Sequence, residues 1–437
     1  MNNLFILMLL YLTYTVISFW LFNCNLLSPS FVFSLSMTVM LSLAYYAATN
    51  MEMLFAINLR TFTIFGVAGL IFLATEFLMY SMHTAKYLSN GSMERHSDKP
   101  EPLKINWQIQ WLFTGFLAIS LVLAVAVLYM NTGGGTWSQR MALYKELLLY
   151  NPENLKMRFI MAQIYKVNIV GMDLLGYVMI YNMSVCKVSV KESLSYIIDT
   201  LLYIAYSAVT TGARQTAVEA VLFLAMIYIT LNIAAEQKKK LWRFIIRSMP
   251  LIIVLASVFT YAGTLVGRVE TKKSGLQNLA EYICGGLYSF NYHIDEGAST
   301  KLWGQASFAY IYAIPQNMGF MPRTDDIMIT GKFDIYGNTV TLFGRWYKDF
   351  GTIGVYVMTC LVSMFFSWFF YERIISSSNR KREHHLARIF YCQFMTGLIW
   401  AGYDDRIASL MTMQTVVFLI FTAVFYKVLI VDKFKIF

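Results

Sequence analysis

Charged and aromatic residues stand together at several points of this chain, next to long apolar segments. The stretch GNTVTLFGRWYKDFGTIGVYV, residues 337–357, places Arg345, Lys348 and Asp349 directly before an apolar run. Guanidinium groups above a bilayer suit the phosphate of a lipid, because phosphate oxygens accept paired hydrogen bonds from arginine. Aromatic rings with Asn, Asp and Arg are typical of sugar-binding clefts, since rings stack on pyranose faces and polar groups meet hydroxyls. The residue types therefore indicate a site for a lipid-linked glycan.

These residues must be positioned by membrane helices. The chain has 437 residues, of which 57% are hydrophobic and only 14% are charged. Apolar runs of about 20 residues recur along its length, as in membrane-spanning helices. We therefore expect an all-α polytopic membrane protein with about eleven transmembrane helices, within a range of ten to twelve. The first run begins at residue 4 without a basic segment or a small-residue cleavage site, so it is expected to be a retained span.

The distribution of basic residues predicts the sidedness of these helices. The expected spans are 3–22, 30–49, 61–82, 109–130, 161–183, 194–210, 216–235, 249–262, 351–371, 388–401 and 411–430. One set of the loops between them holds about half of the 35 Lys and Arg residues in a small part of the loop length. The positive-inside rule makes this set cytoplasmic and the N-terminus external. The net charge of +10 is explained by this rule, so no nucleic-acid partner is expected.

The predicted topology divides the chain into three parts. Residues 1–262 contain helices one to eight, residues 263–350 form one large extracytoplasmic loop, and residues 351–437 contain helices nine to eleven. Long loops in a compact protein are usually functional. A smaller external loop, 131–160, has Met141, Tyr144 and Leu148 on one helical face. That pattern predicts a helix in the membrane interface, with a simple cover over the spans as the alternative.

Five charged residues fall inside expected spans, where each costs roughly 2.5–3.5 kcal/mol on insertion scales. They are Glu76, Lys166, Asp173, Asp199 and Glu219. A hydrogen-bonded network between helices is the favoured explanation for Glu76 and Asp199. Lys166 and Glu219 approach the external surface instead, close to Arg214, which begins the seventh span. An arginine at a helix start opposes the helix dipole, so it requires a carboxylate or an external anion nearby.

Metal chemistry is not expected. The five cysteines are scattered without the spacing of a metal site or a disulfide framework. The pair His384–His385 lies in a highly basic loop and is expected to be a solvated face.

Three short motifs resemble those of the bacterial oligosaccharide repeat-unit polymerases, the Wzy-type enzymes of O-antigen, capsule and exopolysaccharide synthesis. The motifs are TG-x-R at 211–214, Y-x-x-GG at 282–286, and N-x-x-T…DFG-x-x-G, which comprises Asn338, Thr341, Asp349, Phe350, Gly351 and Gly354. The span number and the single large external loop are similar too. The resemblance implies an architecture similar to the C-type membrane glycosyltransferases, located in the bacterial cytoplasmic (inner) membrane with the active site facing the outside or periplasm.

The resemblance also implies a reaction. A growing glycan on undecaprenyl diphosphate is transferred to the non-reducing sugar of a new lipid-linked repeat unit, without a cofactor or metal. The implied partners are these lipid-linked oligosaccharides, membrane lipids and a chain-length regulator protein. The residues expected to bind the diphosphate are Arg214, Arg268, Arg345, Arg140 and Lys166. The candidates for the general base are His293, Asp349 and Glu219. The residues expected to bind sugar are Tyr282, Tyr288, Asn291, Asn338 and Trp346.

Several alternatives stay open at this point. An O-antigen ligase-type transferase has the same architecture and differs only in its acceptor. A flippase or transporter predicts repeat symmetry and a charged central path, which the single large loop does not favour. A structural membrane subunit gives no reason for the external arginines. Within 337–357 itself, simple interfacial anchoring is an alternative in which Trp346 and Tyr347 form an aromatic belt and Lys348 extends to the surface.

Overall fold

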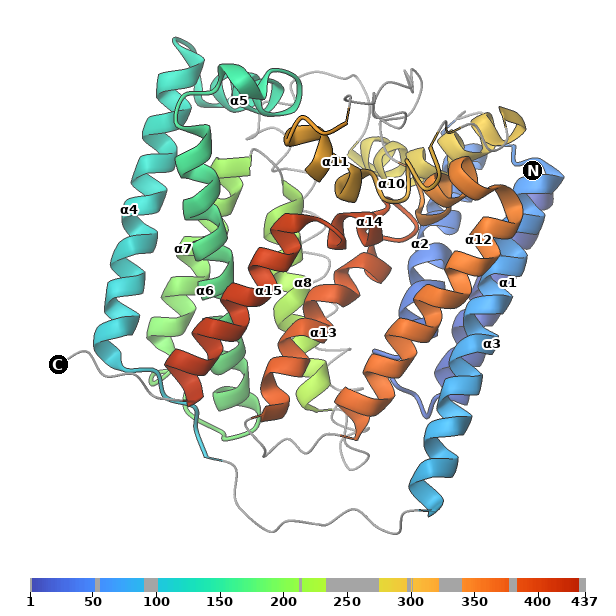
Figure 1. Ribbon diagram of the computed structural model, residues 1–437, viewed down its shortest axis with the longest axis horizontal. Coiled ribbons are helices and arrows are strands. Elements are labelled where there is room, and N and C mark those ends of the chain that lie inside the picture. Colours follow the sequence, from blue (N-terminus) through green and yellow to red (C-terminus); the bar gives the residue numbers. More distant parts are fainter. Residues whose placement is uncertain are drawn as a thin grey trace. The chain divides into compact units, whose positions relative to one another are not determined.

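The structure is a computed structural model, and it describes residues 2–51, 56–89, 101–211, 214–232, 275–296, 300, 302–321, 340–376 and 383–431. Within these ranges the regular elements are all helices (Figure 1). Eight of them are long and apolar enough to cross a membrane. They are Asn2–Leu21, Pro29–Asn50, Leu59–Lys86, Trp107–Thr132, Arg158–Ser184, Leu194–Thr211, Leu342–Ile375 and Met413–Val431. The chain is therefore a helical membrane protein.

These eight helices coincide with eight of the predicted spans. The predicted span 216–235 falls on α8 (Arg214–Leu231), whose apolar part is the shorter Val218–Leu231. The predicted span 388–401 falls on α13 (Glu383–Ile399), which within the described residues is not among the eight helices long and apolar enough to cross a membrane. The predicted span 249–262 lies outside the described residues. Eight spans are thus supported by the structure, and the full set of eleven stays a prediction.

The helices are grouped in two compact units. Unit 1 contains Met1–Ser97, Ser274–Ser377 and Gln393–Val416, and unit 2 contains Asp98–Lys273, Ser378–Cys392 and Val417–Phe437. Unit 1 is built on α1 (Asn2–Leu21), α2 (Pro29–Asn50), α3 (Leu59–Ser89) and α12 (Leu342–Phe369). It also contains α10 (Gly275–His293), α11 (Ala309–Asn317) and α14 (Arg406–Leu410).

Aromatic rings form the core of unit 1. Phe33 of α2 and Phe72 of α3 stack with ring centroids 4.3 Å apart. Phe65 packs edge-on against Phe343 of α12 at 4.8 Å. Tyr11 of α1 is fully buried and donates its hydroxyl hydrogen bond to the Phe65 carbonyl oxygen at 2.8 Å. Large interlocking side chains with satisfied polar ends therefore fix how α12 lies against α2 and α3.

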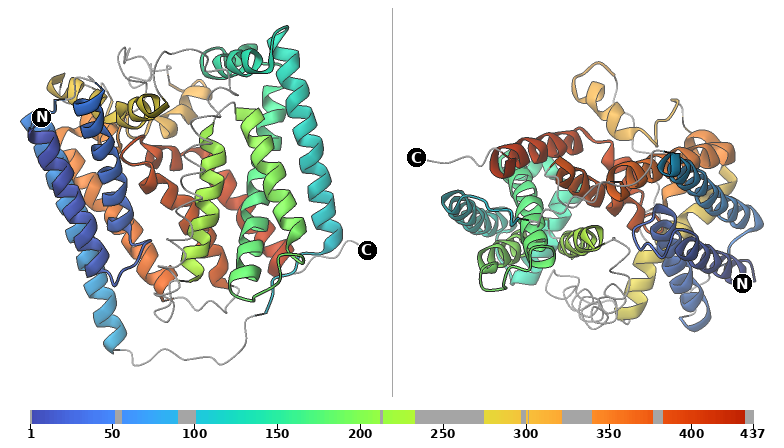
Figure 2. Two further views of the ribbon diagram at one scale, coloured as in Figure 1. Left: turned by 180° about the vertical axis from the view of Figure 1, so that it is seen from behind. Right: turned by 90° about the horizontal axis from the view of Figure 1, so that it is seen from below.

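The two ends of unit 1 differ in character. At one end, Lys86 of α3 forms an ion pair with Glu372 at 3.0 Å, and both belong to the sequence segments that were predicted to be cytoplasmic. At the other end, α3 begins beside α10, since Asn291 accepts hydrogen bonds from Asn58 N and Thr61 Oγ1. In the views of Figures 1 and 2, α10 lies across this second end of unit 1, beside the start of α1. Part of the large predicted loop, α10, is thus helical and lies at the end of unit 1 opposite the Lys86–Glu372 ion pair.

The structure confirms the hydrogen-bonded network between helices that was predicted for Glu76 in unit 1. The Glu76 side chain is fully buried and accepts hydrogen bonds from the Ser30 backbone N–H and from the Tyr371 hydroxyl. Ser30 lies in the first turn of α2, where backbone N–H groups have no partner within the helix. Glu76 therefore links α3, α2 and the end of the α12 segment.

Helix α12 is broken at Gly351. This residue has φ +64° and ψ −159°, a backbone region that essentially only glycine adopts. Residues 342–350 therefore form a separate helical segment, and the spanning segment starts after Gly351, where the sequence predicted it. The change of direction in α12 is visible in Figure 1.

Replacing Gly351 by Ala is expected to lower the free energy of unfolding by about 1–3 kcal/mol, because Ala is strained in this conformation. A Cβ atom at Gly351 would meet no atom within 4 Å, so the effect is conformational and not steric. Gly115 in α4 has the same open space but helical geometry, and Gly115→Ala is the matched control. Thermal unfolding in detergent compares the two variants, and equal melting temperatures would contradict the prediction.

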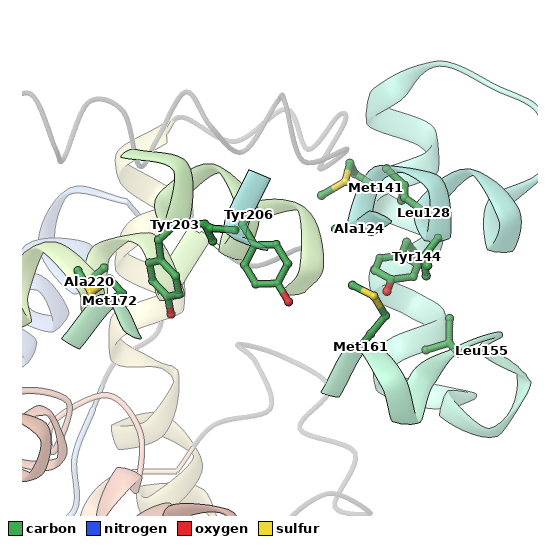
Figure 3. Packing of buried hydrophobic residues seen from close by; sticks show 12 residues of the cluster. Ala124, Leu128, Met141, Tyr144, Leu155, Met161, Met172, Tyr203, Tyr206 and Ala220 are labelled. Atoms are coloured by element: carbon green, nitrogen blue, oxygen red, sulfur yellow. The ribbon is translucent and has the colours of Figure 1, made fainter. Parts of the chain in front are cut away.

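Unit 2 has its own core, formed by α4 (Trp107–Thr132), α5 (Trp137–Tyr150), α6 (Arg158–Ser184), α7 (Leu194–Thr211) and α8. Met141 and Tyr144 of α5 are only 2% and 4% exposed and belong to this core, together with Met161 and Tyr206 (Figure 3). The helix starts with a capping box between Thr136 and Gln139. The helix predicted in loop 131–160 is thus confirmed, and its apolar face packs on the protein.

The sequence analysis made predictions for two polar positions that are buried in unit 2, Asp199 and His385. Asp199 accepts hydrogen bonds from Thr114 Oγ1 at 2.6 Å and Gln110 Nε2 at 3.4 Å, as expected for a network between helices. The prediction for the histidine pair was wrong at His385, which is only 1% exposed. Its Nδ1 lies 2.6 Å from the Tyr177 hydroxyl, because α13 presents this residue to α6 and not to solvent.

Candidate active site in unit 1

The predicted site residues divide between the two units. Those described in unit 1 are His293, Asp349, Arg345, Tyr282, Tyr288, Asn291 and Trp346. Those in unit 2 are Arg140, Lys166, Glu219 and Arg214. Arg268, Asn338 and the side chain of Arg214 lie outside the described part of the chain. The site that the structure assembles within one unit is centred on Arg345.

Arg345 lies on the first segment of α12 and contacts two other parts of unit 1. Its Nη1 donates a hydrogen bond to the Ala306 carbonyl oxygen at 3.1 Å. Its Nε lies 3.7 Å from Asp405 Oδ2, which makes an ion pair too long for a hydrogen bond. The ring of Tyr310 lies 5.9 Å from the guanidinium carbon. Arg345 is thus a largely buried cation, 11% exposed, at the junction of three segments.

Asp349 is placed one helical turn after Arg345 and binds the same turn of the chain. Its Oδ1 accepts a hydrogen bond from the Ala306 N–H at 3.0 Å, and its Oδ2 accepts one from the Ser307 N–H at 2.6 Å. The Ala306–Ser307 backbone is therefore held to α12 by a guanidinium at its carbonyl and by a carboxylate at its N–H groups. This contact gives Asp349 a positioning role, whereas its role as the general base stays a prediction.

Asp405 is a site residue that the sequence did not indicate. It lies just before α14 and is 5% exposed, with Oδ1 accepting a hydrogen bond from the Ala408 N–H at 3.1 Å. Its neighbour Asp404 forms an ion pair with Arg406 at 3.0 Å. The only local signal was the run GYDDR, residues 402–406, after a predicted span. Its relation to Arg345 depends on packing between segments 60 residues apart, which no local pattern encodes.

Aromatic rings lie on the segments next to the ion pair of Arg345 and Asp405. Tyr282 of α10 stacks on Tyr403, with ring centroids 4.5 Å apart. Trp400 packs edge-on against the same Tyr403 at 5.6 Å. Trp346 lies on α12 beside Arg345 but is only 2% exposed and packs against Phe343. Tyr403 is itself only 6% exposed, whereas Tyr282 is partly exposed, and the binding of sugar by Tyr282 stays a prediction.

Burial argues against the anchoring alternative for residues 337–357. Trp346, Tyr347 and Lys348 are 2%, 3% and 8% exposed. An aromatic belt and a lysine reaching the membrane surface require exposed side chains. Tyr347 instead donates a hydrogen bond to the Ile294 carbonyl oxygen at 2.6 Å.

Gly286 marks the point where the segments of the site meet. A Cβ atom on this residue would lie 2.8 Å from the Tyr403 carbonyl oxygen and 2.9 Å from the Thr341 backbone nitrogen. The Leu342 N–H donates a hydrogen bond to the Ala401 carbonyl oxygen at 3.1 Å, next to this contact. Close approach of three backbones requires a residue without a side chain. The Y-x-x-GG motif therefore has a structural reason within this site.

Several buried polar atoms of these segments have no hydrogen-bond partner. They are Arg345 Nε, Asp405 Oδ2, Thr341 Oγ1, Ser307 Oγ, Ser289 Oγ and Trp400 Nε1. Native proteins leave few such atoms, because each costs about 1–3 kcal/mol. Donors and acceptors of this kind, next to a guanidinium and a stacked tyrosine pair, are suited to a ligand with anionic and hydroxyl oxygens.

The other predicted residues of unit 1 lie on α10. The Asn291 side chain forms hydrogen bonds through both of its amide atoms. Its oxygen accepts from Asn58 N, and its nitrogen donates to the Ala56 carbonyl oxygen at 3.1 Å. Tyr288 stacks on Tyr292 at 6.4 Å, and His293 packs edge-on against Tyr292 at 5.0 Å. Asn291 therefore joins α10 to the start of α3, while His293 and Tyr288 lie along the last turns of α10.

Two of the predicted residues of unit 2, Arg140 and Lys166, have local partners. Arg140 of α5 donates to the carbonyl oxygens of Gly133 and Gly135, and its guanidinium carbon lies 4.3 Å from the Tyr129 ring centroid. Lys166 of α6 donates to Gln163 Oε1 at 3.2 Å. Arg140 therefore closes the glycine turn before α5. Among the described residues, no group of three or more His, Cys, Asp and Glu could hold a metal ion.

The electrostatics of Asp405 predict a pH dependence. Burial raises the pKa of Asp405 to about 7, and the nearby Arg345 opposes this shift. Burial also raises the pKa of Asp404, which faces Arg406 and Arg345. At neutral pH, a partly protonated Asp405 leaves part of the Arg345 charge available to an anionic ligand.

The free energy of unfolding should therefore depend on pH between pH 4 and 7. The native state keeps the Asp405 proton up to a pH of about 7, whereas the unfolded chain loses it near 3.9, so the native state binds more protons in this window. The free energy of unfolding should therefore fall as pH rises through the window, by about 1.4 kcal/mol per pH unit at most. Asp405→Asn should flatten this dependence in thermal unfolding experiments. An unchanged slope in the variant would show that other groups cause it.

Comparison of the chain with protein-family models, with curated proteins and with solved structures finds no match.

Proposed function

We propose that this protein is a glycosyltransferase that polymerises lipid-linked oligosaccharide repeat units at the outer face of the bacterial cytoplasmic membrane. The observation that carries the proposal is the buried pair Arg345–Asp405, whose facing atoms Nε and Oδ2 have no hydrogen-bond partner. It lies next to a stacked tyrosine pair, at the end of unit 1 opposite the Lys86–Glu372 ion pair. The motifs shared with the repeat-unit polymerases support the same reaction.

In the proposed reaction, the acceptor hydroxyl of a new repeat unit attacks the anomeric carbon of the growing glycan. A C–O bond forms to the acceptor, and the bond between the anomeric carbon and the lipid diphosphate breaks. The electron pair of that bond leaves with the diphosphate, and the hydroxyl proton passes to a base. Direct displacement of this kind inverts the anomeric centre.

Arg345 has the central role in this proposal. Charge accumulates on the leaving diphosphate in the transition state, and a fixed guanidinium stabilises it without reorganisation. The contacts of Arg345 with Ala306 and Asp405 hold the group in place before the ligand binds. Arg214, Arg268, Arg140 and Lys166 stay predictions from the sequence as phosphate ligands.

Asp349 supports Arg345 by binding the other side of the Ala306–Ser307 turn. His293 is then the proposed base in unit 1, since histidine is the side chain that most often serves as a general base. Glu219 is the candidate base from unit 2. Tyr282, stacked on Tyr403, is proposed to bind a sugar ring of the glycan.

Deletion of the gene, followed by gel analysis of the surface glycan, tests this function. The proposal predicts that the ladder of long chains disappears and that single capped repeat units remain. Absence of any glycan on the lipid core would instead indicate a ligase. Accumulation of lipid-linked units on the cytoplasmic leaflet would indicate a flippase, and both of these outcomes would contradict the proposal.

A further inference from the structure

Residues 302–321 of unit 1 expose large apolar side chains although they do not form a span. Trp303, Met318 and Phe320 are 74%, 64% and 75% exposed. The helix in this segment, α11, has only 9 residues. At 1.5 Å per residue it is roughly 14 Å long, about half the thickness of the hydrocarbon core of a bilayer. The segment cannot cross a membrane, so its exposed apolar residues need another explanation.

The composition of this segment is that of a membrane-interface element. Residues 302–321 read LWGQASFAYIYAIPQNMGFM and contain no Asp, Glu, Lys, Arg or His. Ile311 and Ile314 of α11 are 47% and 37% exposed. Apolar surface exposed to water costs about 25 cal/mol for each Å². Trp and Tyr favour the boundary between headgroups and acyl chains, where their rings meet apolar chains and their polar atoms meet water.

The exposed surface of this segment continues that of a membrane span. Trp303 contacts Phe350, the residue before the break in α12, with ring centroids 5.2 Å apart. After the break, Ile353, Val357 and Leu361 are 76%, 52% and 51% exposed. Their spacing of four residues places them on one face of the helix. The exposed apolar stripe of α12 is therefore joined to Trp303 through the contact with Phe350.

The opposite side of the same segment is polar and belongs to the candidate site. Ala306 donates its backbone hydrogen bond to Asp349 and accepts one from Arg345. Ser307 donates its backbone hydrogen bond to Asp349 as well. One short stretch thus carries the Arg345 contact on one side and exposed apolar side chains on the other.

We propose that residues 302–321 insert into the boundary between the headgroups and acyl chains of the bilayer. Phospholipid acyl chains cover Trp303, Met318 and Phe320, and the backbone contacts of Ala306 then fix Arg345 at the depth of the lipid phosphates. This insertion is a property of the chain in any bilayer. It goes beyond the proposed reaction and is tested without any substrate.

Spin labels measure the depth directly in the full chain reconstituted in phospholipid nanodiscs. Cysteines are introduced singly at Met318 and Phe320 in a variant whose native cysteines are replaced by Ser or Ala. Val357→Cys is the lipid control, and Lys191→Cys, in an exposed turn of unit 2, is the aqueous control. Labels at 318 and 320 should be less exposed to a water-soluble nickel chelate than the label at 191, and no deeper than the label at 357. Nickel exposure equal to that at 191 would overturn the proposal.

Tryptophan quenching gives a second measurement that leaves the native cysteines in place. The difference between the wild-type chain and Trp303→Phe isolates the fluorescence of Trp303. In vesicles of brominated phosphatidylcholine, this component should be quenched more by bromines near the headgroup than by bromines deep in the acyl chain. Quenching by aqueous iodide with no quenching by either lipid would contradict the insertion. Either outcome is independent of whether the chain transfers a glycan.

Discussion

Arg345→Ala is expected to lower the rate of glycan transfer by about 10²–10³-fold, as for loss of one oxyanion-stabilising donor. In cells this loss should remove the long glycan chains. The physical reason is that Arg345 is a preorganised cation, held by the Ala306 carbonyl oxygen at 3.1 Å and by Asp405 at 3.7 Å. Its removal also leaves the buried Asp405 carboxyl group without its cation, so this group takes up a proton and the free energy of unfolding falls.

A double variant separates the loss of catalysis from the loss of stability. Arg345→Gln with Asp405→Asn removes both charges and keeps side chains that can hydrogen-bond to each other. The melting temperature of this variant should return toward that of the wild-type chain, whereas transfer should stay at the level of Arg345→Ala. Asp405→Asn alone keeps the guanidinium and should remain within about tenfold of wild-type transfer. Wild-type activity in the double variant would contradict the role of the Arg345 charge.

Gly286→Ala is expected to destabilise unit 1 and to abolish transfer with it. The added Cβ would lie 2.8 Å from the Tyr403 carbonyl oxygen and 2.9 Å from the Thr341 nitrogen, and neither is a flexible side-chain atom. Three segments would have to separate, and overpacking of this kind costs about 1–3 kcal/mol. Because the same segments carry Arg345 and Asp405, a shift between them also displaces the ion pair.

Thermal unfolding and transfer assays are made on the same Gly286→Ala preparation. Gly134→Ala is the matched control, because a Cβ there meets no atom within 4 Å and the residue has no positive φ. The control should unfold and react like the wild-type chain. If Gly286→Ala behaves like the control in both assays, the close approach of the three segments is not required.

The sequence predicted those features that depend on local composition. Eight predicted spans coincide with helices of spanning length, since apolar runs and helix length are linked directly. The helix in loop 131–160 was predicted from the spacing of Met141 and Tyr144, and both side chains are buried in unit 2. Gly351 was singled out by its motif in the sequence, and its φ of +64° explains why glycine is required there.

Features that depend on contacts between distant segments were not predictable in this way. His385 lies in a basic stretch, yet α13 buries it against Tyr177. The carboxylate of Asp349 was predicted only as a candidate base, and the structure shows that it binds the N–H groups of Ala306 and Ser307. Asp405 lies near the end of a predicted span, and only its ion pair with Arg345 identifies it as a site residue. In each case the partner lies more than 40 residues away, where periodicity gives no information.

The central claim is that this chain transfers a glycan from a lipid diphosphate to another lipid-linked unit. The most direct measurement uses the purified protein in nanodiscs, with lipid-linked repeat units isolated from the deletion strain. The account predicts growing chains on a gel and the release of one undecaprenyl diphosphate for each new linkage, with both signals lost in Arg345→Ala. Repeat units that stay single, with no undecaprenyl diphosphate released by the active wild-type preparation, would contradict it.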